Sequence, residues 1–230
     1  VSILVPFVDE SKCTHCGVCH DVCAFNAIAV MGSAVLVFNE LCHGCGACTR
    51  FCPVGAITEV PHHIGVVEQG DADGVRFVDG VLTIGQPMAP PIIRQVKQHT
   101  GGEGVTIIDA SPGTSCPVVE AVKGSDFCVL VTEPTPFGLN DLRLAVETMR
   151  QLGLPHGAII NRVGVGDART EDYCRQEGVP ILMTIPLDER IARSYSRGVP
   201  LLEALPEYRQ RFLDLYERIV DLVHERSCRP

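Results

Sequence analysis

Eight cysteines near the beginning of the chain constrain its fold more than any other feature. They form two quartets with the same spacing, Cys-x2-Cys-x2-Cys-x3-Cys, and each cysteine of the second quartet lies 29 positions after its counterpart in the first. The flanking residues repeat as well, CTHCGVCHDVCAFNAI against CHGCGACTRFCPVGAI. This self-similarity indicates a duplicated unit. The repeat spans about residues 9–60, too few for a substantial hydrophobic core, so we expect bound metal to hold it together.

The spacing within each quartet suits a cubane cluster. Three closely spaced thiolates can surround three corners of one cube, and the fourth cysteine reaches the neighbouring cube, as in two-cluster ferredoxins. We therefore expect a ferredoxin-type domain over residues 9–60 that binds two [4Fe–4S] clusters. The expected ligands are Cys13, Cys16, Cys19 and Cys52 for cluster I, and Cys42, Cys45, Cys48 and Cys23 for cluster II.

A pair of zinc sites is the alternative reading of these cysteines. Zinc motifs usually present two Cys-x-x-Cys pairs, so two quartets in register favour iron–sulfur clusters. His15, His20 and His43 lie beside the cysteines. We expect them to be surface or supporting residues, because the corners of both cubes are already filled. Two clusters in one small domain suggest a relay for electrons.

Composition narrows the class of the rest of the chain. Hydrophobic residues make up 46% and there is no Trp, so the core must be built from Val, Ile, Leu and Ala, as in parallel α/β sheets. The net charge of −9 argues against nucleic acid or an anionic membrane as the main partner. No apolar run has the length of a membrane span, and no signal peptide is evident. We expect a cytoplasmic protein, and the oxygen sensitivity of exposed clusters makes an anaerobic cell plausible.

The segment after the cysteines is expected to be a connector, residues 61–98. It contains VRFVDGVLTIG, which predicts a hairpin with its turn at Asp79-Gly80, and IIRQVKQ, which predicts a short helix. From residue 99 to 230 apolar strands alternate with amphipathic helices, which predicts a parallel sheet covered on both faces. The strands are expected at 105–109, 127–132, 157–161 and 180–185, and the helices at 138–152, 167–177, 188–196 and 206–226.

Four segments of this second part carry a family resemblance. VTIIDASPGT, VLVTEPTPFGLNDL, GAIINRVG and ILMTIPLDERIARSYSRGVP occur in the order and spacing of the MinD-type, ParA-type and Mrp-type P-loop ATPases. The whole chain resembles the archaeal and anaerobe-bacterial members that carry an inserted ferredoxin domain. The resemblance implies a P-loop-NTPase-like α/β domain that lacks its first strand over 99–230, with residues 1–8 as a strand or linker of that domain.

The same resemblance implies a set of nucleotide-site residues. Asp109 would be the Walker B aspartate near Mg²⁺, and Pro112, Gly113 and Thr114 would form the switch loop. Asn161 and Arg162 would border adenine, and the loop from Pro186 to Asp188 would pack on the other side of the base. Without the resemblance, Asp109 could equally be a helix cap and Asn161 a polar strand end.

The resemblance fails at one decisive motif. The 230 residues contain no G-x-x-x-x-G-K-[ST] phosphate loop, whose backbone N–H groups and lysine cradle the phosphates. Two explanations remain open: the chain, which starts at Val1, is a fragment of a longer ATPase, or it is a derivative that has lost ATP hydrolysis. We expect Mg-ATP to bind only if the loop is supplied, and whether the protein is an ATPase stays open.

Three functions remain on these grounds. The first is an ATP-coupled electron-transfer protein with a redox partner protein and, by resemblance, a homodimer. The second is a nucleotide-independent electron carrier, and the third is a scaffold or carrier for iron–sulfur clusters. Cys116, seven positions after Asp109, matches a cluster ligand of the related nitrogenase iron protein. A small buried or redox-sensitive thiol is the favoured reading, because no second cysteine for a bridging cluster is evident.

Overall fold

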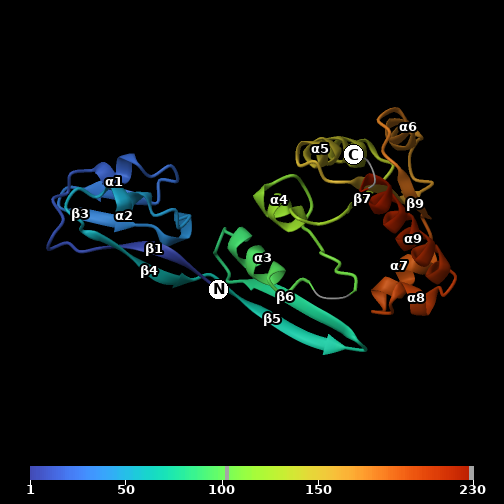
Figure 1. The fold of residues 1–230 in the computed structure, drawn as a ribbon, viewed down its shortest axis with the longest axis horizontal. Helices are drawn as coiled ribbons and strands as arrows, with labels where there is room; N and C mark the ends of the chain where they lie inside the picture. The colour runs from blue at the N-terminus through green and yellow to red at the C-terminus, as the bar shows by residue number, and fades with distance from the viewer. Residues whose placement is uncertain (102–103, 228–230) are drawn as a thin grey trace. The chain divides into compact units, whose positions relative to one another are not determined.

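The computed structural model describes residues 1–101 and 104–227. The chain divides into two compact units, Val1–Asp109 and Ala110–Pro230 (Figure 1). Small antiparallel sheets build the first unit, and a three-stranded parallel sheet with helices builds the second. Among the described residues, every helix is too short or too polar to span a membrane.

The first unit begins with two short sheets around the cysteine repeat. Strand β1 (Ser2–Val8) pairs antiparallel with β4 (Ile57–His63) along its full length, and β2 (Ile28–Met31) pairs with β3 (Ala34–Val37). Helices α1 (Val18–Asp21) and α2 (Ala47–Phe51) and the 3₁₀ turn η1 (Asn39–Leu41) complete this part. Residues 1–8 were expected to belong with the α/β domain, but their hydrogen-bonding partner is the strand that follows the second cysteine quartet.

The sequence repeat is also a repeat of backbone conformation. Three positions in each half have positive φ values between 53° and 84°. They are equivalent under the shift of 29 positions: His15 and Gly44, Gly17 and Gly46, and Asn26 and Gly55. The first half therefore adopts left-handed turns with His and Asn where the second half uses Gly, because Gly reaches this region without steric cost and Asn tolerates it.

A hairpin and a helix follow the cysteine repeat. Strands β5 (Gly65–Ala72) and β6 (Val75–Leu82) are joined by Asp73 and Gly74, with φ values of 50° and 79°. The predicted turn at Asp79-Gly80 is wrong, because Gly80 lies inside β6 opposite Val67.

The helix explains why residue 80 is a glycine. The predicted short helix is confirmed as α3 (Pro90–Lys97). A Cβ on Gly80 would lie 2.4 Å from Cγ2 of Ile92, a buried residue of α3. The glycine therefore serves the packing of α3 on the hairpin and not a turn.

The second unit contains the parallel sheet predicted from the sequence. Its strand order is β7 (Cys128–Thr132), β8 (His156–Val163) and β9 (Ile181–Pro186), all parallel. The helices are α4 (Cys116–Val122), α5 (Pro136–Gln151), α6 (Arg169–Gln176), α7 (Glu189–Ser196), α8 (Leu201–Ala204) and α9 (Tyr208–Ser227). The strands predicted at 127–132, 157–161 and 180–185 are confirmed, as are the four predicted helices.

Helices cover both faces of this sheet. Leu142 and Val146 of α5 and Cys174 of α6 pack with Ala158 of β8. The next residue of β8, Ile159, packs in a second cluster that includes residues of α8 and α9. Neighbouring residues of one strand point to opposite faces, so β8 is buried on both sides, as a central parallel strand should be.

The strand predicted at 105–109 is wrong. Residues 105–110 have no regular secondary structure, and Ile107 is 90% exposed. An apolar run becomes a strand only when a neighbouring strand takes up its N–H and C=O groups. None of the strands in the described residues pairs with this segment.

Candidate metal centre

The two cysteine quartets occupy equivalent places in the two halves of the repeat. In each half the first two cysteines lie in a loop, the third lies in the short helix, and the fourth follows the helix. The loop turns into each helix through a left-handed glycine, Gly17 with φ 84° before α1 and Gly46 with φ 70° before α2. Each of these turns lies between the second and the third cysteine of its quartet.

Two cavities in the first unit are lined by the eight thiols. Cavity I is lined by Cys13, Cys16, Cys19 and Cys52, among other residues. Cavity II is lined by Cys42, Cys45, Cys48 and Cys23, among other residues. The first three cysteines of each quartet thus share a cavity with the fourth cysteine of the other quartet.

Backbone N–H groups donate to the sulfur atoms in a repeated pattern. The N–H groups of His15 and Gly44 donate to Sγ of Cys13 and Cys42, both at 3.4 Å. Those of Ala27 and Ala56 donate to Sγ of Cys23 and Cys52, both at 3.3 Å. Such donors stabilise thiolates and tune clusters that the thiolates hold. Four thiols and backbone donors around each cavity are therefore a donor set that fits a [4Fe–4S] cluster.

Burial changes the acidity of several of these thiols. It raises the pKa of Cys19, Cys42 and Cys48, since a thiolate is disfavoured where water is excluded. At Cys52 burial acts in the same direction, but backbone N–H groups from Val54 to Ile57 outweigh it and lower the pKa. Ligation requires thiolates, so metal binding at the buried thiols must release protons.

Apolar packing behind the cavities follows the repeat as well. Ile28 and Ile57, which are 29 positions apart, are 1% and 5% exposed and form a small core with Cys19. Each isoleucine comes five residues after the fourth cysteine of its quartet. The core therefore anchors the segment that carries the fourth cysteine from one half of the repeat to the other.

The three histidines beside the cysteines have other partners in the structure. His20 Nδ1 lies 2.9 Å from the carbonyl oxygen of Ile28, and His15 Nε2 lies 3.0 Å from Oε2 of Glu10. The ring of His43 stacks on Phe25, with centroids 3.6 Å apart and planes 6° apart. Glu10, Cys13 and His15 form a group with donor atoms within 4.8 Å of one another, but Glu10 and His15 already contact each other.

The residues expected to border a nucleobase lie near the carboxyl ends of the strands in the second unit. Asn161 and Arg162 fall in the irregularity between Ile160 and Val163, where β8 leaves its regular pairing with β9. Arg162 has φ 57°, and its Nη1 lies 3.2 Å from Oε1 of Glu133, just after β7. Bulges of this kind redirect side chains at strand ends.

The loop after β9 reaches the same strand ends. The N–H of Leu187 donates to the carbonyl oxygen of Val163 at 3.0 Å. The structure thus brings Asn161 and Arg162 close to the loop from Pro186 to Asp188, and their nucleotide roles stay predictions.

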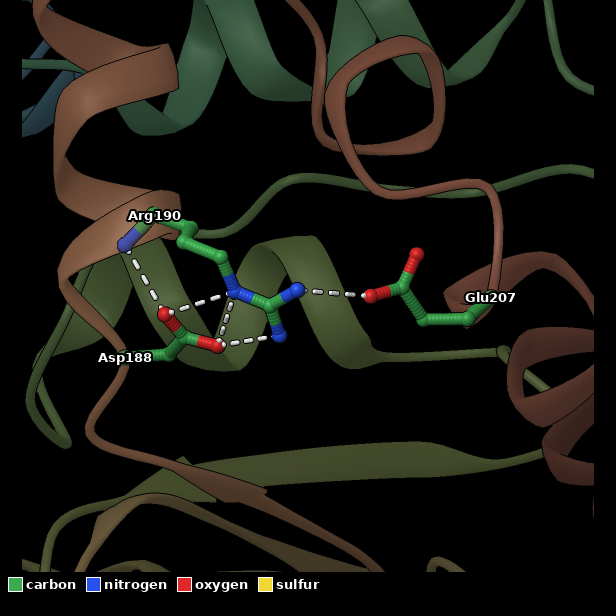
Figure 2. Close-up of polar contacts among 3 residues, drawn as sticks. All are labelled: Asp188, Arg190 and Glu207. Atoms are coloured by element: carbon green, nitrogen blue, oxygen red, sulfur yellow. Dashed lines mark hydrogen bonds and ion pairs between the residues drawn. The ribbon is translucent and has the colours of Figure 1, made fainter.

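Asp188 has a structural task that the sequence did not reveal. It is the N-cap of α7, and its Oδ1 accepts the N–H of Arg190 at 2.8 Å. Its carboxylate also binds the Arg190 guanidinium, 2.7 Å from Nη2, and Arg190 contacts Glu207 at 3.1 Å (Figure 2). The hydrogen bonds from the Arg190 side chain and backbone hold the pKa of Asp188 below its usual value. An aspartate just before a helix is the signal that could have predicted this cap.

The other expected residues are on exposed chain. Asp109 lies in the irregular segment at the end of the first unit, and Pro112, Gly113 and Thr114 lie in an exposed bend of the second unit. Their nucleotide roles stay predictions. Cys116 is exposed at the start of α4, whereas Cys174 is fully buried in α6.

The class of the first unit follows from this geometry together with a comparison of families. Residues 6–59 match the 4Fe-4S dicluster domain. With eight cysteines around two cavities, the domain binds two [4Fe–4S] clusters. This confirms the cofactor expected from the cysteine spacing.

Similarity to other proteins extends beyond this domain. The chain is 28% identical to the uncharacterized protein MJ0579 of Methanocaldococcus jannaschii over 88% of its own length and 71% of that protein. It is 27% identical to a second uncharacterized protein of the same organism, MJ0578, over 93% of its length and 74% of that protein. It is also 26% identical to an iron-sulfur cluster carrier protein of Pyrococcus horikoshii, over 59% of this chain and 53% of that protein. The last similarity is distant and covers only part of each chain.

Proposed function

We propose that this protein transfers electrons through two [4Fe–4S] clusters with crossed ligand sets. Cys13, Cys16, Cys19 and Cys52 bind cluster I, and Cys42, Cys45, Cys48 and Cys23 bind cluster II. The observation that carries the proposal is the lining of the two cavities, because each contains three cysteines of one quartet and the fourth of the other. Crossing links the two halves covalently through both sites, which favours clusters that stay bound during repeated reduction and oxidation.

The exposure of the ligands supports exchange of electrons with a partner. Cys16 and Cys45, the second cysteines of the two quartets, are exposed, whereas the other six are buried or half-buried. Each site therefore has one edge open to a docked redox partner protein and the remaining ligands inside the domain. The solvent exposure of the ligands and the hydrogen bonds to sulfur set the potentials at which these sites work.

The second unit supports coupling of this electron transfer to a nucleotide. Ligands of open α/β sheets bind outside the carboxyl ends of the strands, and Asn161, Arg162 and the loop from Pro186 to Asp188 lie there. In the proposal these residues border the base, Asp109 acts near Mg²⁺, and Pro112, Gly113 and Thr114 sense the phosphates. A phosphate loop must be supplied for this function, and a homodimer rearranged by the nucleotide would pass the signal to the clusters. An electron carrier that works without nucleotide remains the alternative.

A second candidate function is delivery of clusters to other proteins. The distant similarity to the iron-sulfur cluster carrier protein of Pyrococcus horikoshii favours it. The fully cysteinyl, crossed donor sets favour retention of the clusters instead. The two functions make opposite predictions for a protein exposed to an apo-acceptor.

The test combines ligand mapping with retention. Paramagnetically shifted β-proton signals of the cysteines in the native protein should fall into the two crossed sets, and the protein should contain eight iron atoms per chain. Each cluster should be reduced and reoxidised reversibly without loss of iron, and an apo-ferredoxin should take up no cluster. Signals that group by quartet would contradict the crossing. Transfer of iron to the apo-ferredoxin would show that the protein delivers clusters and would contradict electron transfer as its function.

A further inference from the structure

The two cavities differ at positions that the repeat makes equivalent. Phe25 and His43 both line cavity II, and their equivalents in the other half, Val54 and Thr14, both line cavity I. The ligands and the backbone hydrogen bonds to sulfur are the same in the two halves. These two pairs of side chains are therefore candidates for the cause of a difference between the two sites.

Phe25 and His43 form a direct contact between the two halves of the repeat. Their rings stack with centroids 3.6 Å apart and planes 6° apart. Phe25 comes two residues after Cys23. Cys23 is the fourth cysteine of the first quartet, and it lines cavity II. His43 follows Cys42, the first cysteine of the second quartet. The stack thus joins the chain on either side of cavity II, next to two of its cysteines.

Cavity I has no stacked rings at the equivalent place, because Val54 and Thr14 are not aromatic. Its ligand loop has a polar connection instead: Glu10 contacts His15 and accepts the N–H of Val35 at 3.3 Å. Glu10 is 50% exposed, and exposed polar contacts of this kind contribute little. This connection also does not involve the segment of Cys52, the fourth cysteine of cavity I.

We infer that the Phe25–His43 stack is a clamp that holds Cys23 in cavity II, so that cluster II is retained longer than cluster I. The inference rests on the crossed ligand sets of the proposed function. Loss of a cluster must begin with a ligand moving away and water or a chelator entering. The stack opposes both events at cavity II, since it ties the segment of Cys23 to the opposite loop and lines the cavity with two aromatic rings. Phe25 and His43 are positioning residues that act through Cys23.

The inference also bears on which cluster could be given up. If one of the two sites releases its iron to a chelator or an acceptor, it is cavity I. The clamp therefore makes the domain asymmetric, with one retained and one more labile site, although the eight ligands obey a two-fold repeat.

The experiment follows iron loss from the native protein to an excess of an iron chelator under anaerobic conditions. Shifted β-proton signals of Cys16 and Cys45 report cavities I and II separately, since Cys16 lines cavity I and Cys45 lines cavity II. We expect two phases, with the Cys45 signals surviving about tenfold longer than those of Cys16, in the range that an aromatic pair can supply. Phe25→Val should bring the Cys45 phase to the rate of the Cys16 phase and leave the latter unchanged. Phe25→Tyr, which keeps the stack, should retain the native difference between the loss rates of the Cys45 and Cys16 signals.

A matched double variant introduces the aromatic pair into cavity I. Thr14→His with Val54→Phe should slow loss of the Cys16 signals and leave those of Cys45 unchanged. Equal rates in the native protein, or equal acceleration of both phases in Phe25→Val, would overturn the inference. Those results leave the proposed function intact as long as the iron count is eight and the signals fall into the crossed sets. A different iron count, or β-proton signals that fall into other sets, would contradict the proposed function itself.

Discussion

Arg162 contacts Glu133 across the carboxyl edge of the parallel sheet, with 3.2 Å between Nη1 and Oε1. The contact joins the end of β8 to the residue after β7, and Arg162 makes it from a backbone with a positive φ of 57°. A non-glycine residue in this region is strained relative to an ordinary strand conformation. The strain is held where the resemblance expects a nucleobase, which is the pattern seen at many binding sites.

Substitutions at Arg162 should separate the ion pair from the backbone strain. Both Arg162→Ala and Arg162→Gly remove the contact to Glu133, which is exposed and contributes at most about 1 kcal/mol. Only Gly adopts positive φ without cost, so we expect Arg162→Gly to be about 1 kcal/mol more stable than Arg162→Ala. Urea unfolding of the full chain measures the difference. Equal stabilities would mean that residue 162 does not keep its left-handed conformation in solution.

Packing of α3 on the hairpin should make Gly80 intolerant of a side chain. A Cβ there would lie 2.4 Å from Cγ2 of Ile92, so Gly80→Ala should cost about 1–3 kcal/mol of unfolding free energy. Gly70 in the neighbouring strand is the control, because a Cβ at that position meets no heavy atom within 4 Å. Gly70→Ala should change the stability by less than about 0.5 kcal/mol. A similar cost at both positions would argue against the close approach of α3.

The pKa of Asp188 should depend on Arg190. The folded state lowers this pKa through the hydrogen bonds from Arg190, so the ionised carboxylate stabilises the fold. The stabilisation is complete above the ordinary pKa of Asp, about 3.9, and is lost as the pH falls through the lower folded value. Carboxyl ¹³C titration should show the Asp188 midpoint rising towards about 3.9 in Arg190→Gln.

Arg193→Gln is the matched control for this titration. Arg193 lies on the same helix but contacts Glu189, at 2.9 Å. Its substitution should leave the Asp188 midpoint where it is in the native protein. A shift as large as that of Arg190→Gln would show that the general charge of α7, and not the direct contact, lowers the pKa.

Iron removal should unfold the cysteine repeat and spare the second unit. The core of the repeat is small, centred on Ile28 and Ile57, whereas the second unit buries hydrophobic residues on both faces of its sheet. Chelation should therefore make residues 9–60 at least about tenfold more sensitive to protease, because metal binding supplies the folding energy of such small domains. Residues 128–186 should stay protected. Equal sensitivity of both regions would mean that the second unit depends on the clusters.

This 230-residue chain should bind Mg-ATP weakly. It contains no phosphate loop, and Asp109 and Thr114 cannot hold a triphosphate without backbone N–H groups and a lysine to neutralise it. We expect a Kd of roughly 1 mM or weaker for a fluorescent ATP analogue, unchanged by Asp109→Asn. Binding in the low micromolar range would show that other residues of the chain supply the phosphate site.

Local patterns in the sequence were sufficient for the metal site and for most helices and strands. The spacing of the eight cysteines defined the cofactor, and it also predicted the crossed ligand sets, because a short connection cannot return a fourth thiol to its own cube. Alternating apolar strands and amphipathic helices predicted the parallel sheet of the second unit. These features depend on residues close together in the chain, so they can be read without knowledge of the fold.

Other features depended on which distant segments meet. Two Asp-Gly pairs signal a turn equally well, but the turn lies at Asp73 and Gly74, whereas Gly80 lies inside β6 and packs against Ile92. The partner of β1, the irregularity at Arg162 and the unpaired run at 105–109 likewise depend on strand neighbours. The stack of Phe25 on His43 joins residues from the two halves of the repeat. Cysteine spacing and apolar patterns are enough to predict the cluster-binding cysteines and the kinds of elements, whereas the partner of each element depends on the fold, because hydrogen bonding and packing between remote segments leave no local pattern.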